Sequence, residues 1–459
     1  MPPATSEAAT PEAAPSDLAA LLARLAAAPM RRWQVIAIAL CVALNALDGF
    51  DVLSISFAAP GIAREWAVGK AALGFVLSYE LIGMATGSIV LGQVADRIGR
   101  RTTAIGCLMV MALGMGLTMR VGSLTQLAGC RLLTGLGIGG MLAVTNALVA
   151  EYANDRWRSA AVAVMAAGYP LGAIVGGAFV GHLLASGTWR SVFGLGLGMS
   201  LMLLPLAWMW LPEPIGAGIG RARPGALARL NAALARLGEA PLDRLPPVAA
   251  GPRPGLAELF APALRRTTVL LILAYFLHVL TFYFILKWTP KIVADMGWSP
   301  AQAAGVLVWA NVGGLAGGLA FSALSLRVDL RRLITLYLVA AGVTVAAFGQ
   351  IHGSLATLSW AVALGGFCTN GAIVGLYALI ATTFPTALRS GGTGLVIGIG
   401  RMGAALGPIV AGYLFAADFG FAAVATIMAG GALGAAVLLQ FVPRRTDPDL
   451  STARHQPAR

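Results

Sequence analysis

Several charged side chains lie inside long apolar segments of this sequence, where a charge is costly unless it is paired. Asp48 and Asp51 are three residues apart, and Glu80, Arg131 and Arg401 lie in three further apolar segments. Residues three apart share one face of a helix, so the two aspartates are expected to face the same neighbours. Carboxyl groups in such a place can take up and release protons, and a guanidinium can bind a carboxylate with two hydrogen bonds.

The composition places these charges in a membrane protein. Of 459 residues, 58% are hydrophobic and 11% are charged, and the mean hydropathy is +0.81. Soluble chains are about 45–50% apolar and about 25% charged. So few charges could not cover a soluble globule, and disordered, fibrous and disulfide-stapled classes are excluded as well. The four cysteines lie in apolar runs and are expected to be buried without disulfides. The net charge of +13 suggests a nucleic-acid partner, but its distribution along the chain argues against one.

Twelve apolar stretches are long enough to cross a bilayer as helices, for which about 20 residues are needed. The runs are continuous rather than alternating, which excludes a transmembrane β-barrel. The predicted fold is therefore all-α and integral to the membrane, with transmembrane helices at residues 33–58, 71–93, 103–120, 124–151, 159–185, 190–211, 266–290, 300–325, 333–350, 355–383, 393–417 and 420–442.

Basic residues predict the orientation of these spans, because cytoplasmic loops are enriched in Lys and Arg. With both termini inside, the inner segments hold 24 of the 32 Lys and Arg residues, the outer loops hold five and the spans hold three. Both termini are therefore expected in the cytoplasm. Residues 1–30 lack the basic start and apolar core of a cleaved signal peptide.

The chain is predicted to divide into two groups of six spans. Residues 31–211 and 265–442 are expected to form two six-helix bundles, joined by a cytoplasmic linker at 212–264 that is rich in Pro, Gly and Arg. Residues 227–237 have helical spacing and predict a short surface helix within that linker. The tails, 1–30 and 443–459, are expected to be cytoplasmic, the first of them disordered.

The two halves show a weak internal repeat. A shift of 231 residues places Arg100 on Arg331, and the same shift places Arg158 on Arg389. Small residues after the second position also coincide, although Gly and Ala are abundant enough for coincidence. Repeated helix bundles with a site between them are typical of transporters.

A charged loop follows the second span, with the sequence GQVADRIGRR at residues 92–101. Its carboxylate can accept hydrogen bonds from a helix N-terminus, and its guanidinium groups can pair with carboxylates at the inner face. Such a cluster could latch two bundles in one conformation, or it could be an ordinary basic inner loop. A degraded copy, LRVDLRR, occupies residues 326–332. The candidate gating residues here are Asp96, Arg97, Arg100 and Arg101.

This loop, and the fourth span with RLLTGLGIGG at residues 131–140 and Glu151 at its end, resemble signatures of the major facilitator superfamily. The sequence LDGFD at residues 47–51, the Arg131 and Glu151 pair, and Arg401 in GIGRMG resemble the aromatic acid:proton symporter family. The resemblance covers nearly the whole chain outside the tails and linker. It implies two pseudo-symmetric bundles and proton-coupled import of an aromatic carboxylate, such as benzoate, a hydroxybenzoate or protocatechuate, for catabolism. It also implies a bacterial inner membrane.

Helix geometry brings the buried charges to similar depths. At 1.5 Å per residue, Asp48 lies about 22 Å from the inner end of its span, and Arg131 lies about 10 Å from the outer end of its own. Our hypothesis is that Arg131 holds one of the two aspartates, Asp48 or Asp51, ionised while the other carries the proton. A permanent structural ion pair is the alternative. Glu80 is expected to be either a second proton site or the partner of a basic residue.

Arg401 is the predicted partner of the substrate carboxylate, and a structural pair or an inner-gate contact is the alternative. The aromatic ring needs apolar walls, for which each candidate could equally be packing within a bundle. Lys287 is expected to reach the outer interface along its apolar stem, or else to attract anions there. His278 could titrate near neutrality, and Asn311 and Asn370 could bind substrate or join helices. The aromatic candidates are Tyr79, Tyr275, Phe276, Tyr283, Trp309 and Tyr377.

Other functions are disfavoured by the sequence. The four histidines are scattered and no metal spacing or nucleophile motif occurs, so we expect no enzyme activity, no metal and no cofactor. The short tails disfavour a receptor. An exporter of drugs or metabolites in exchange for protons, or a transporter of another organic anion, stays open, because residues 168–172 and 403–408 resemble a pattern of such antiporters. The expected partners are the substrate, protons and the lipid bilayer, and the protein is expected to be a monomer.

Overall fold

The computed structural model describes residues 27–212, 227–228, 231, 255–351, 353–385 and 388–443, without the side chains of Asp96 and Ser390. The predicted N-terminal tail up to residue 26, most of the linker with its short helix at 227–237, and the C-terminal tail from residue 444 lie outside the described residues. His352 lies outside them as well.

Helices make up almost all of the described chain, and twelve of them are long and apolar enough to cross a membrane. The first six are α2 (Arg32–Glu65), α3 (Lys70–Ile98), α4 (Arg100–Thr118), α5 (Leu124–Tyr152), α6 (Arg158–Ser186) and α7 (Arg190–Trp210). The short helix η1 (Leu256–Phe260) precedes the others, which are α9 (Pro262–Asp295), α10 (Pro300–Leu324), α11 (Leu330–Phe348), α12 (Leu355–Thr383), α13 (Arg389–Gly400), α14 (Met402–Ala416) and α15 (Phe421–Gln440). The twelve predicted spans are confirmed.

The eleventh span differs from the prediction, because Arg401 divides it into α13 and α14. Small residues flank the division. A side chain at Gly400 would meet the ring of Tyr275, and one at Gly403 would meet the backbone of Phe276. The span therefore approaches α9 closely on both sides of Arg401.

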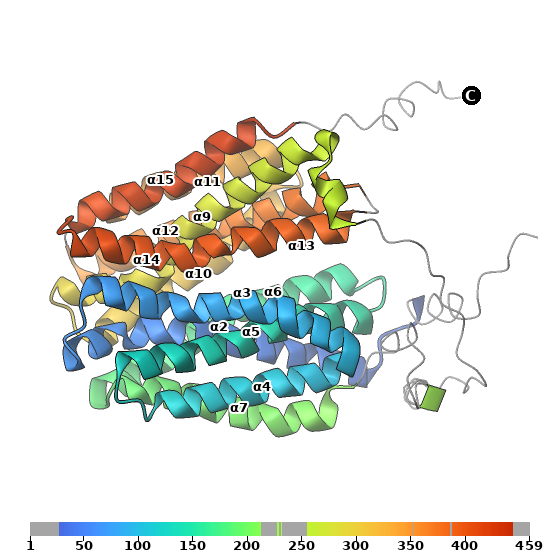
Figure 1. Cartoon of the computed structure of the whole chain (residues 1–459), viewed down its shortest axis with the longest axis horizontal. Coiled ribbons are helices and arrows are strands. Elements are labelled where there is room, and N and C mark those ends of the chain that lie inside the picture. Colours follow the sequence, from blue (N-terminus) through green and yellow to red (C-terminus); the bar gives the residue numbers. More distant parts are fainter. Residues whose placement is uncertain are drawn as a thin grey trace, which may run out of the picture.

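Two bundles of six spans lie side by side, with α2 to α7 in one and α9 to α15 in the other (Figure 1). The shift of 231 residues relates them closely, since it carries the bounds of α5 onto those of α12. A similar bond, one residue apart in this register, joins the third span of each bundle to the end of its last helix: Arg101 Nη2 donates to the carbonyl of Trp208 over 2.6 Å, and Arg331 Nη1 donates to the carbonyl of Val442 over 2.6 Å. The predicted pseudo-symmetry is thus confirmed.

Glycines set the closest helix contacts in both bundles. Side chains at Gly135 and Gly139 of α5 would collide with the backbone of α3, and side chains at Gly313 and Gly317 of α10 would collide with the backbone of α12. Without a hydrophobic force between helices in lipid, such small residues allow the backbone contact that holds helices together.

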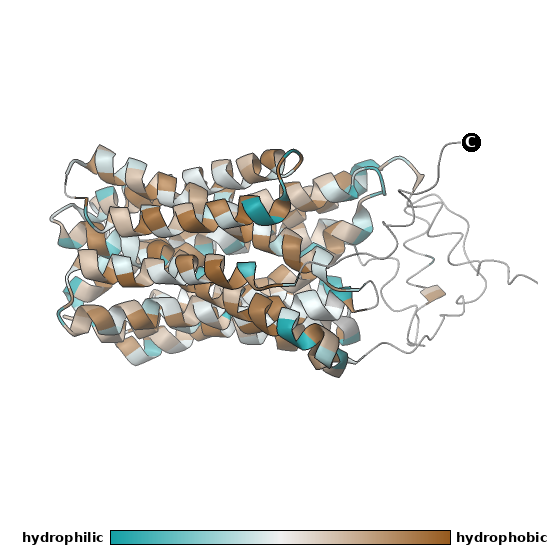
Figure 2. Cartoon of the chain, turned by 90° about the horizontal axis from the view of Figure 1, so that it is seen from above, coloured by the Kyte–Doolittle hydropathy of each residue, from teal (hydrophilic) through white to brown (hydrophobic). Residues whose placement is uncertain are grey.

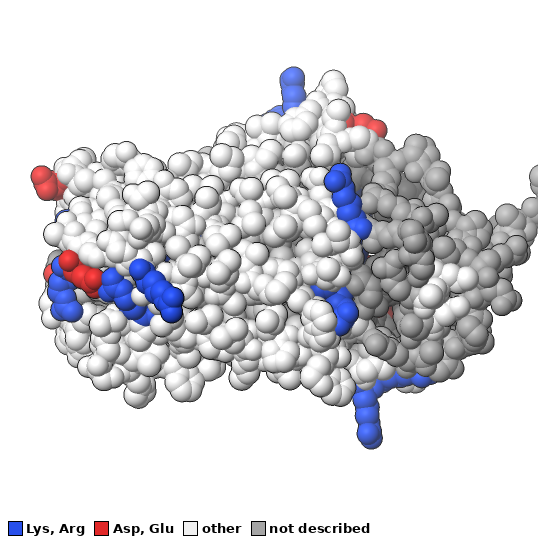
Figure 3. Space-filling model, turned by 60° about the horizontal axis from the view of Figure 1, so that its bottom comes forward, with Lys and Arg blue, Asp and Glu red and all other residues white. Residues whose placement is uncertain are grey.

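The outer surface of the bundles fits a bilayer. Hydrophilic residues gather mostly toward the ends of the helices, and the lengths between them are largely hydrophobic or neutral (Figure 2). On one face of the molecule, the charged side chains lie near the two ends and leave the middle uncharged (Figure 3). This uncharged belt is what the hydrocarbon core of a membrane requires.

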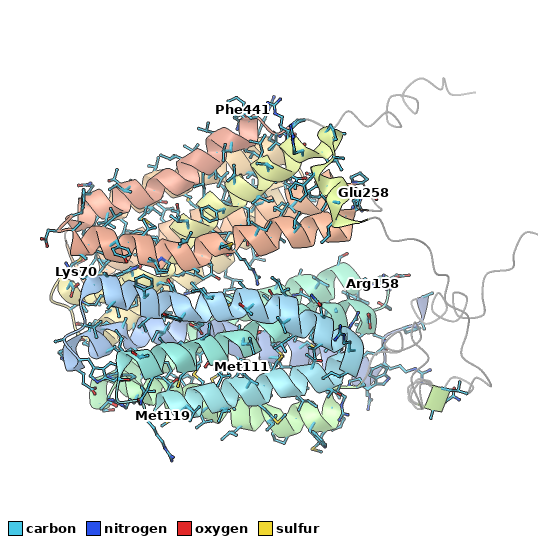
Figure 4. All side chains as sticks on the ribbon, viewed as in Figure 1. Lys70, Met111, Met119, Arg158, Glu258 and Phe441 are labelled. Atoms are coloured by element: carbon cyan, nitrogen blue, oxygen red, sulfur yellow. The ribbon has the colours of Figure 1, made fainter. Side chains whose placement is uncertain are left out.

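The two ends of the molecule differ in how the bundles meet. We call the end that carries Arg158 and Glu258 the linker end and the end that carries Lys70 the distal end (Figure 4). Three helix pairs provide most of the contact between the described parts of the bundles: α3 with α14, α6 with α10, and α2 with α9. A side chain at Gly74 would meet the backbone of Pro408, and Lys70 Nζ lies 5.7 Å from the centre of the Phe415 ring. By contrast, α13 packs mainly on α9, α12 and η1 of its own bundle. The described helices are therefore closed together at the distal end.

Candidate functional site

A fully buried ion pair joins Arg131 of α5 to Glu80 of α3. Arg131 Nη2 also donates to the main-chain carbonyl of Asp51 over 3.0 Å, and the guanidinium lies 5.3 Å from the centre of the Phe193 ring. The pair forms because α3 and α5 touch at Gly135, one turn beyond Arg131, where a Cβ would strike the backbone of Glu80. The close approach places both charges at the same level.

Lys287 adds a second cation to Glu80 from the other bundle. Its side chain is 0% exposed, and Nζ donates to Glu80 Oε2 over 3.2 Å and to the carbonyl of Val52. The expectation that Lys287 reaches the outer interface was therefore wrong. Contact between α9 and α2 covers the residue, and its stem turns toward the bundle interface. Glu80 was expected to be a second proton site or the partner of a basic residue, and in the structure it is the partner of two basic residues.

Asp48 and Asp51 are both 0% exposed. Among the described residues, none makes a hydrogen bond to any of their four carboxylate oxygens. Space around Asp51 is tight, since a Cβ at Gly196 would lie 3.0 Å from its Oδ1. In this conformation Arg131 therefore does not pair with an aspartate carboxylate as hypothesised; Glu80 takes that place. The structure thus holds two buried acids without partners beside a paired network.

A small cavity of about 30 Å³ lies beside this network, where α6 faces α9, α10 and α12. Its walls combine aromatic and apolar groups with a few polar ones. Asn311 Nδ2 donates to the carbonyl of Leu307 over 3.0 Å, and Asn370 Nδ2 donates to the carbonyl of Gly314 over 2.6 Å. The lining residues that matter most here are Tyr169, Pro170, Phe282, Asn311, Thr369 and Asn370.

Two predicted binding residues line this cavity and a third contacts its wall, whereas Trp309 lies apart from it. Asn311 and Asn370 line it, and His278 Nε2 contacts the carbonyl of the lining residue Thr369 over 2.9 Å. Trp309 is 44% exposed and packs 5.8 Å, between ring centres, from Trp360, which is 70% exposed. Trp309 therefore lies on the outer face of its bundle, whereas the next two residues of α10 face the cavity.

Arg401 lies in a group of tyrosines near the junction of α13 and α14. It contacts Tyr377, and Tyr275 and Tyr283 lie close to its charge. The hydroxyls of Tyr275 and Tyr377 are 3.1 Å apart. Tyr283 also lies near Tyr169 of the cavity wall, so it connects Arg401 with the cavity. Of the other aromatic candidates, Tyr79 is half-buried on α3, next to Glu80, and Phe276 packs its backbone on α14.

Most of the cavity wall was not predicted from the sequence, including Tyr169, Phe282 and Thr369. A signal for one of them was present. The 231-residue shift places Asp51 on Phe282 and Glu80 on Asn311, so the positions that carry charge in the first bundle line the cavity in the second. Tyr169 lies in the run at residues 168–172, whose resemblance to an antiporter pattern did not indicate a cavity wall.

The charged loop at the linker end forms a separate cluster. Arg100 pairs with Glu151, with both side chains partly exposed, and Arg101 lies 5.6 Å from the Trp208 ring. Arg97 is exposed at the end of α3. The side chain of Asp96 lies outside the described part of the structure. All of these contacts stay within the first bundle, and a gating role stays a prediction.

Two helical bundles with buried charges and a cavity at their interface define a membrane transporter. Among the described residues, no three His, Cys, Asp or Glu side chains could hold a metal ion together. The profile of the Major Facilitator Superfamily matches residues 38–348 and again residues 271–459. In fold, the chain is similar to a solved D-xylose-proton symporter, with a TM-score of 0.67 and 17% identity over 89% of this chain and 98% of that one.

Curated relatives extend this likeness over most of the chain. A gallate transporter of Pseudomonas putida is 30% identical, covering 90% of this chain and 92% of its own. A 4-hydroxybenzoate transporter, PcaK, of the same species is 31% identical over 87% and 90%. A 3-(3-hydroxy-phenyl)propionate transporter of Escherichia coli is 32% identical over 87% and 91%. The chain belongs to the Major Facilitator Superfamily and, within it, to the aromatic acid:proton symporter family, and it is a transporter rather than an enzyme.

Proposed function

We propose that this protein imports an aromatic carboxylate together with protons across the bacterial inner membrane by alternating access. The observation that carries the proposal is the pair Asp48 and Asp51, buried without partners one turn apart, beside the ion pairs of Glu80 and an interface cavity. The three relatives named above are transporters of aromatic carboxylates by their names.

The two aspartates suit reversible proton binding. An ionised carboxylate without a hydrogen-bond partner is expensive in a low-dielectric interior, and a bound proton removes that charge. Arg131 lies against the Asp51 main chain and already holds Glu80. It could therefore shift toward Asp51 when the proton leaves, with Glu80 still paired to Lys287. We therefore assign proton coupling to Asp48 and Asp51. Glu80 is the acid that balances the charges of Arg131 and Lys287.

The residues of the cavity wall suit an aromatic acid, which the cavity of about 30 Å³ would admit only after the bundles move apart. Phe282, Tyr169 and Pro170 offer flat apolar walls, and Asn311, Asn370 and Thr369 offer polar groups to ring hydroxyls. Arg401, connected to the cavity through Tyr283, offers the guanidinium for the carboxylate. His278 supports the wall residue Thr369 through a hydrogen bond to its main-chain carbonyl.

Orientation follows from the basic residues. The segments predicted to be inner hold 24 of the 32 Lys and Arg, and their described parts, such as Arg158, lie at the linker end, so this end would face the cytoplasm. The distal end, where the bundles are in contact, would then face the outside and be closed, and substrate would leave through the linker end. A monoanion that moves with one proton carries no net charge, so the pH gradient alone would supply about 1.4 kcal/mol per pH unit.

Uptake of radiolabelled 4-hydroxybenzoate, gallate and benzoate into proteoliposomes tests the proposal. We expect accumulation when the outer pH is the lower one, and collapse of that accumulation with a protonophore. Uptake that ignores the proton gradient would reduce the protein to a facilitator, and uptake of none of these acids would contradict the substrate class.

A further inference from the structure

The ammonium of Lys287 makes its hydrogen bonds to the opposite bundle. Its residue belongs to α9 of the second bundle, and both recorded acceptors of its ammonium, the Val52 carbonyl and the Glu80 carboxylate, belong to the first. No other described cation links the interior of the two bundles by an ion pair. The ammonium is 0% exposed, so water does not share in its solvation.

Opening of the distal end must break both contacts together. Alternating access moves one bundle against the other, and α9 would leave α2 and α3 as the distal halves separate. Glu80 would keep a partner, because Arg131 is carried by α5 of its own bundle. Lys287 would lose both acceptors and face the opened cleft with its charge unpaired.

Other cations of the second bundle lie elsewhere along the same path. Lys291 pairs with Asp295 at the distal rim, and Arg401 lies deeper among the tyrosines. Lys287 falls between them on α9. It is four residues beyond Tyr283, hence on the same face of the helix, and Tyr283 lies close to Arg401. From the distal rim inward, the order along α9 is therefore Lys291, Lys287 and Tyr283, and Tyr283 leads to Arg401.

We propose that Lys287 is a carboxylate-binding site with two alternating partners: Glu80 when the distal end is closed, and the carboxylate of the incoming substrate when it is open. The identity of the second carboxylate rests on the proposed function. On closure, Glu80 displaces the substrate from Lys287, and the substrate carboxylate passes along α9 toward Arg401. The Lys287–Glu80 pair also holds the distal end closed while the site faces the other side.

Sidedness of substrate affinity separates this role from a structural one. The distal face is presented in right-side-out vesicles and the linker face in everted vesicles. Counterflow of radiolabelled 4-hydroxybenzoate, which needs no proton gradient, gives KM from either side. For Lys287→Gln we expect KM from the distal side to rise about tenfold or more, since a charge-assisted hydrogen bond is lost. KM from the linker side should stay unchanged, because Lys287 is then docked on Glu80.

Matched variants make the result specific. Lys287→Arg keeps the charge and should recover most of the distal affinity. Glu80→Gln also breaks the interbundle pair but leaves the ammonium, so distal KM should not rise. In Lys287→Gln the Glu80 carboxylate keeps Arg131 as its partner, so this variant should fold. Lys287→Met also lacks the charge and should show the same high distal KM.

Distances between spin labels test the closing role without any substrate. Gly69 and Gly420 lie at the distal end of the first and second bundle, and a Cβ at either position meets no atom within 4 Å. Cysteines at both sites, in a background without the four native cysteines, report the distal separation. Lys287→Gln and Glu80→Gln should each populate a longer distance than the parent, and Lys287→Arg should not.

Equal KM changes from both sides, or none from the distal side, would overturn the carboxylate exchange. An unchanged distance distribution in both neutral variants would overturn the closing role. If the parent protein moves no aromatic acid at all, the proposed function is at fault, and the distance measurement alone then decides the inference about Lys287.

Discussion

Arg131 and Glu80 form an ion pair with both side chains 0% exposed, and the two residues belong to neighbouring helices of one bundle. Removal of Arg131 leaves Glu80 with only the Lys287 ammonium, and it leaves the buried Asp51 carbonyl without its donor. We therefore expect Arg131→Ala to lower the stability by about 1–3 kcal/mol or more, read as the midpoint of unfolding in detergent. Arg100→Ala is the matched control, because its pair with Glu151 is partly exposed, at 25% and 35%. That pair should contribute at most about 1 kcal/mol. Equal losses in the two variants would contradict the buried network.

Asp48→Asn and Asp51→Asn test the proton site. Each change keeps the shape and removes the ionisable group, and the carboxylates have no hydrogen bonds to lose in the described structure. We expect full stability, loss of pH-driven accumulation in at least one variant, and retained counterflow. Asp295→Asn, at an exposed position on α9, is the control and should accumulate substrate normally. Full pH-driven accumulation in both Asp48→Asn and Asp51→Asn, at equal expression, would eliminate the aspartates as proton carriers.

The helices were predictable from sequence because length and hydropathy decide whether a segment spans a bilayer, and both are local properties. The partner of Arg131 was not, because it depends on how closely α3 and α5 approach, and that distance is set by Gly135 meeting the backbone of Glu80. Lys287 shows the same limit. Its place near a span end favoured the interface, and only contact with the other bundle buries it.

The different roles of the two bundles could be predicted only in part from the sequence. In the 231-residue register, Asp51 and Glu80 fall on Phe282 and Asn311. The equivalent positions thus carry charge in one bundle and line the cavity in the other. A repeat in sequence predicts that such positions occupy equivalent places, but their joint use at one interface appears only when the two bundles are placed together.

Gly135→Ala should disturb the ion pair from outside it. The added methyl group would strike the Glu80 carbonyl and push α3 from α5. Overpacking of this kind costs about 1–3 kcal/mol, and the shifted Glu80 should also lower the transport rate. Gly129→Ala on the same helix is the control, since nothing lies within 4 Å of its Cβ. A Gly135→Ala protein with parental stability and transport would argue that α3 and α5 are not held this closely.

Arg401→Ala should weaken substrate binding. We expect KM for 4-hydroxybenzoate to rise about tenfold or more from both sides of the membrane, because a guanidinium–carboxylate contact is lost. Arg401→Lys keeps the charge but not the paired hydrogen bonds, so it should recover part of the affinity. Arg389→Ala, exposed at the start of α13, should leave KM unchanged. Should Arg401→Ala bind normally while losing stability, Arg401 would be a structural partner of the tyrosines.

Asn311 and Asn370 should decide which aromatic acids are accepted. Both line the cavity, where a buried carboxamide left without a hydrogen-bonding ligand costs about 1–3 kcal/mol. Asn311→Leu and Asn370→Leu should therefore lower kcat/KM for 4-hydroxybenzoate about tenfold relative to benzoate, which lacks the ring hydroxyl. Trp309→Leu is the control on α10, since that ring lies 44% exposed against Trp360. It should leave the ratio unchanged. A ratio that moves with Trp309 and not with the asparagines would place the ring-binding site outside this cavity.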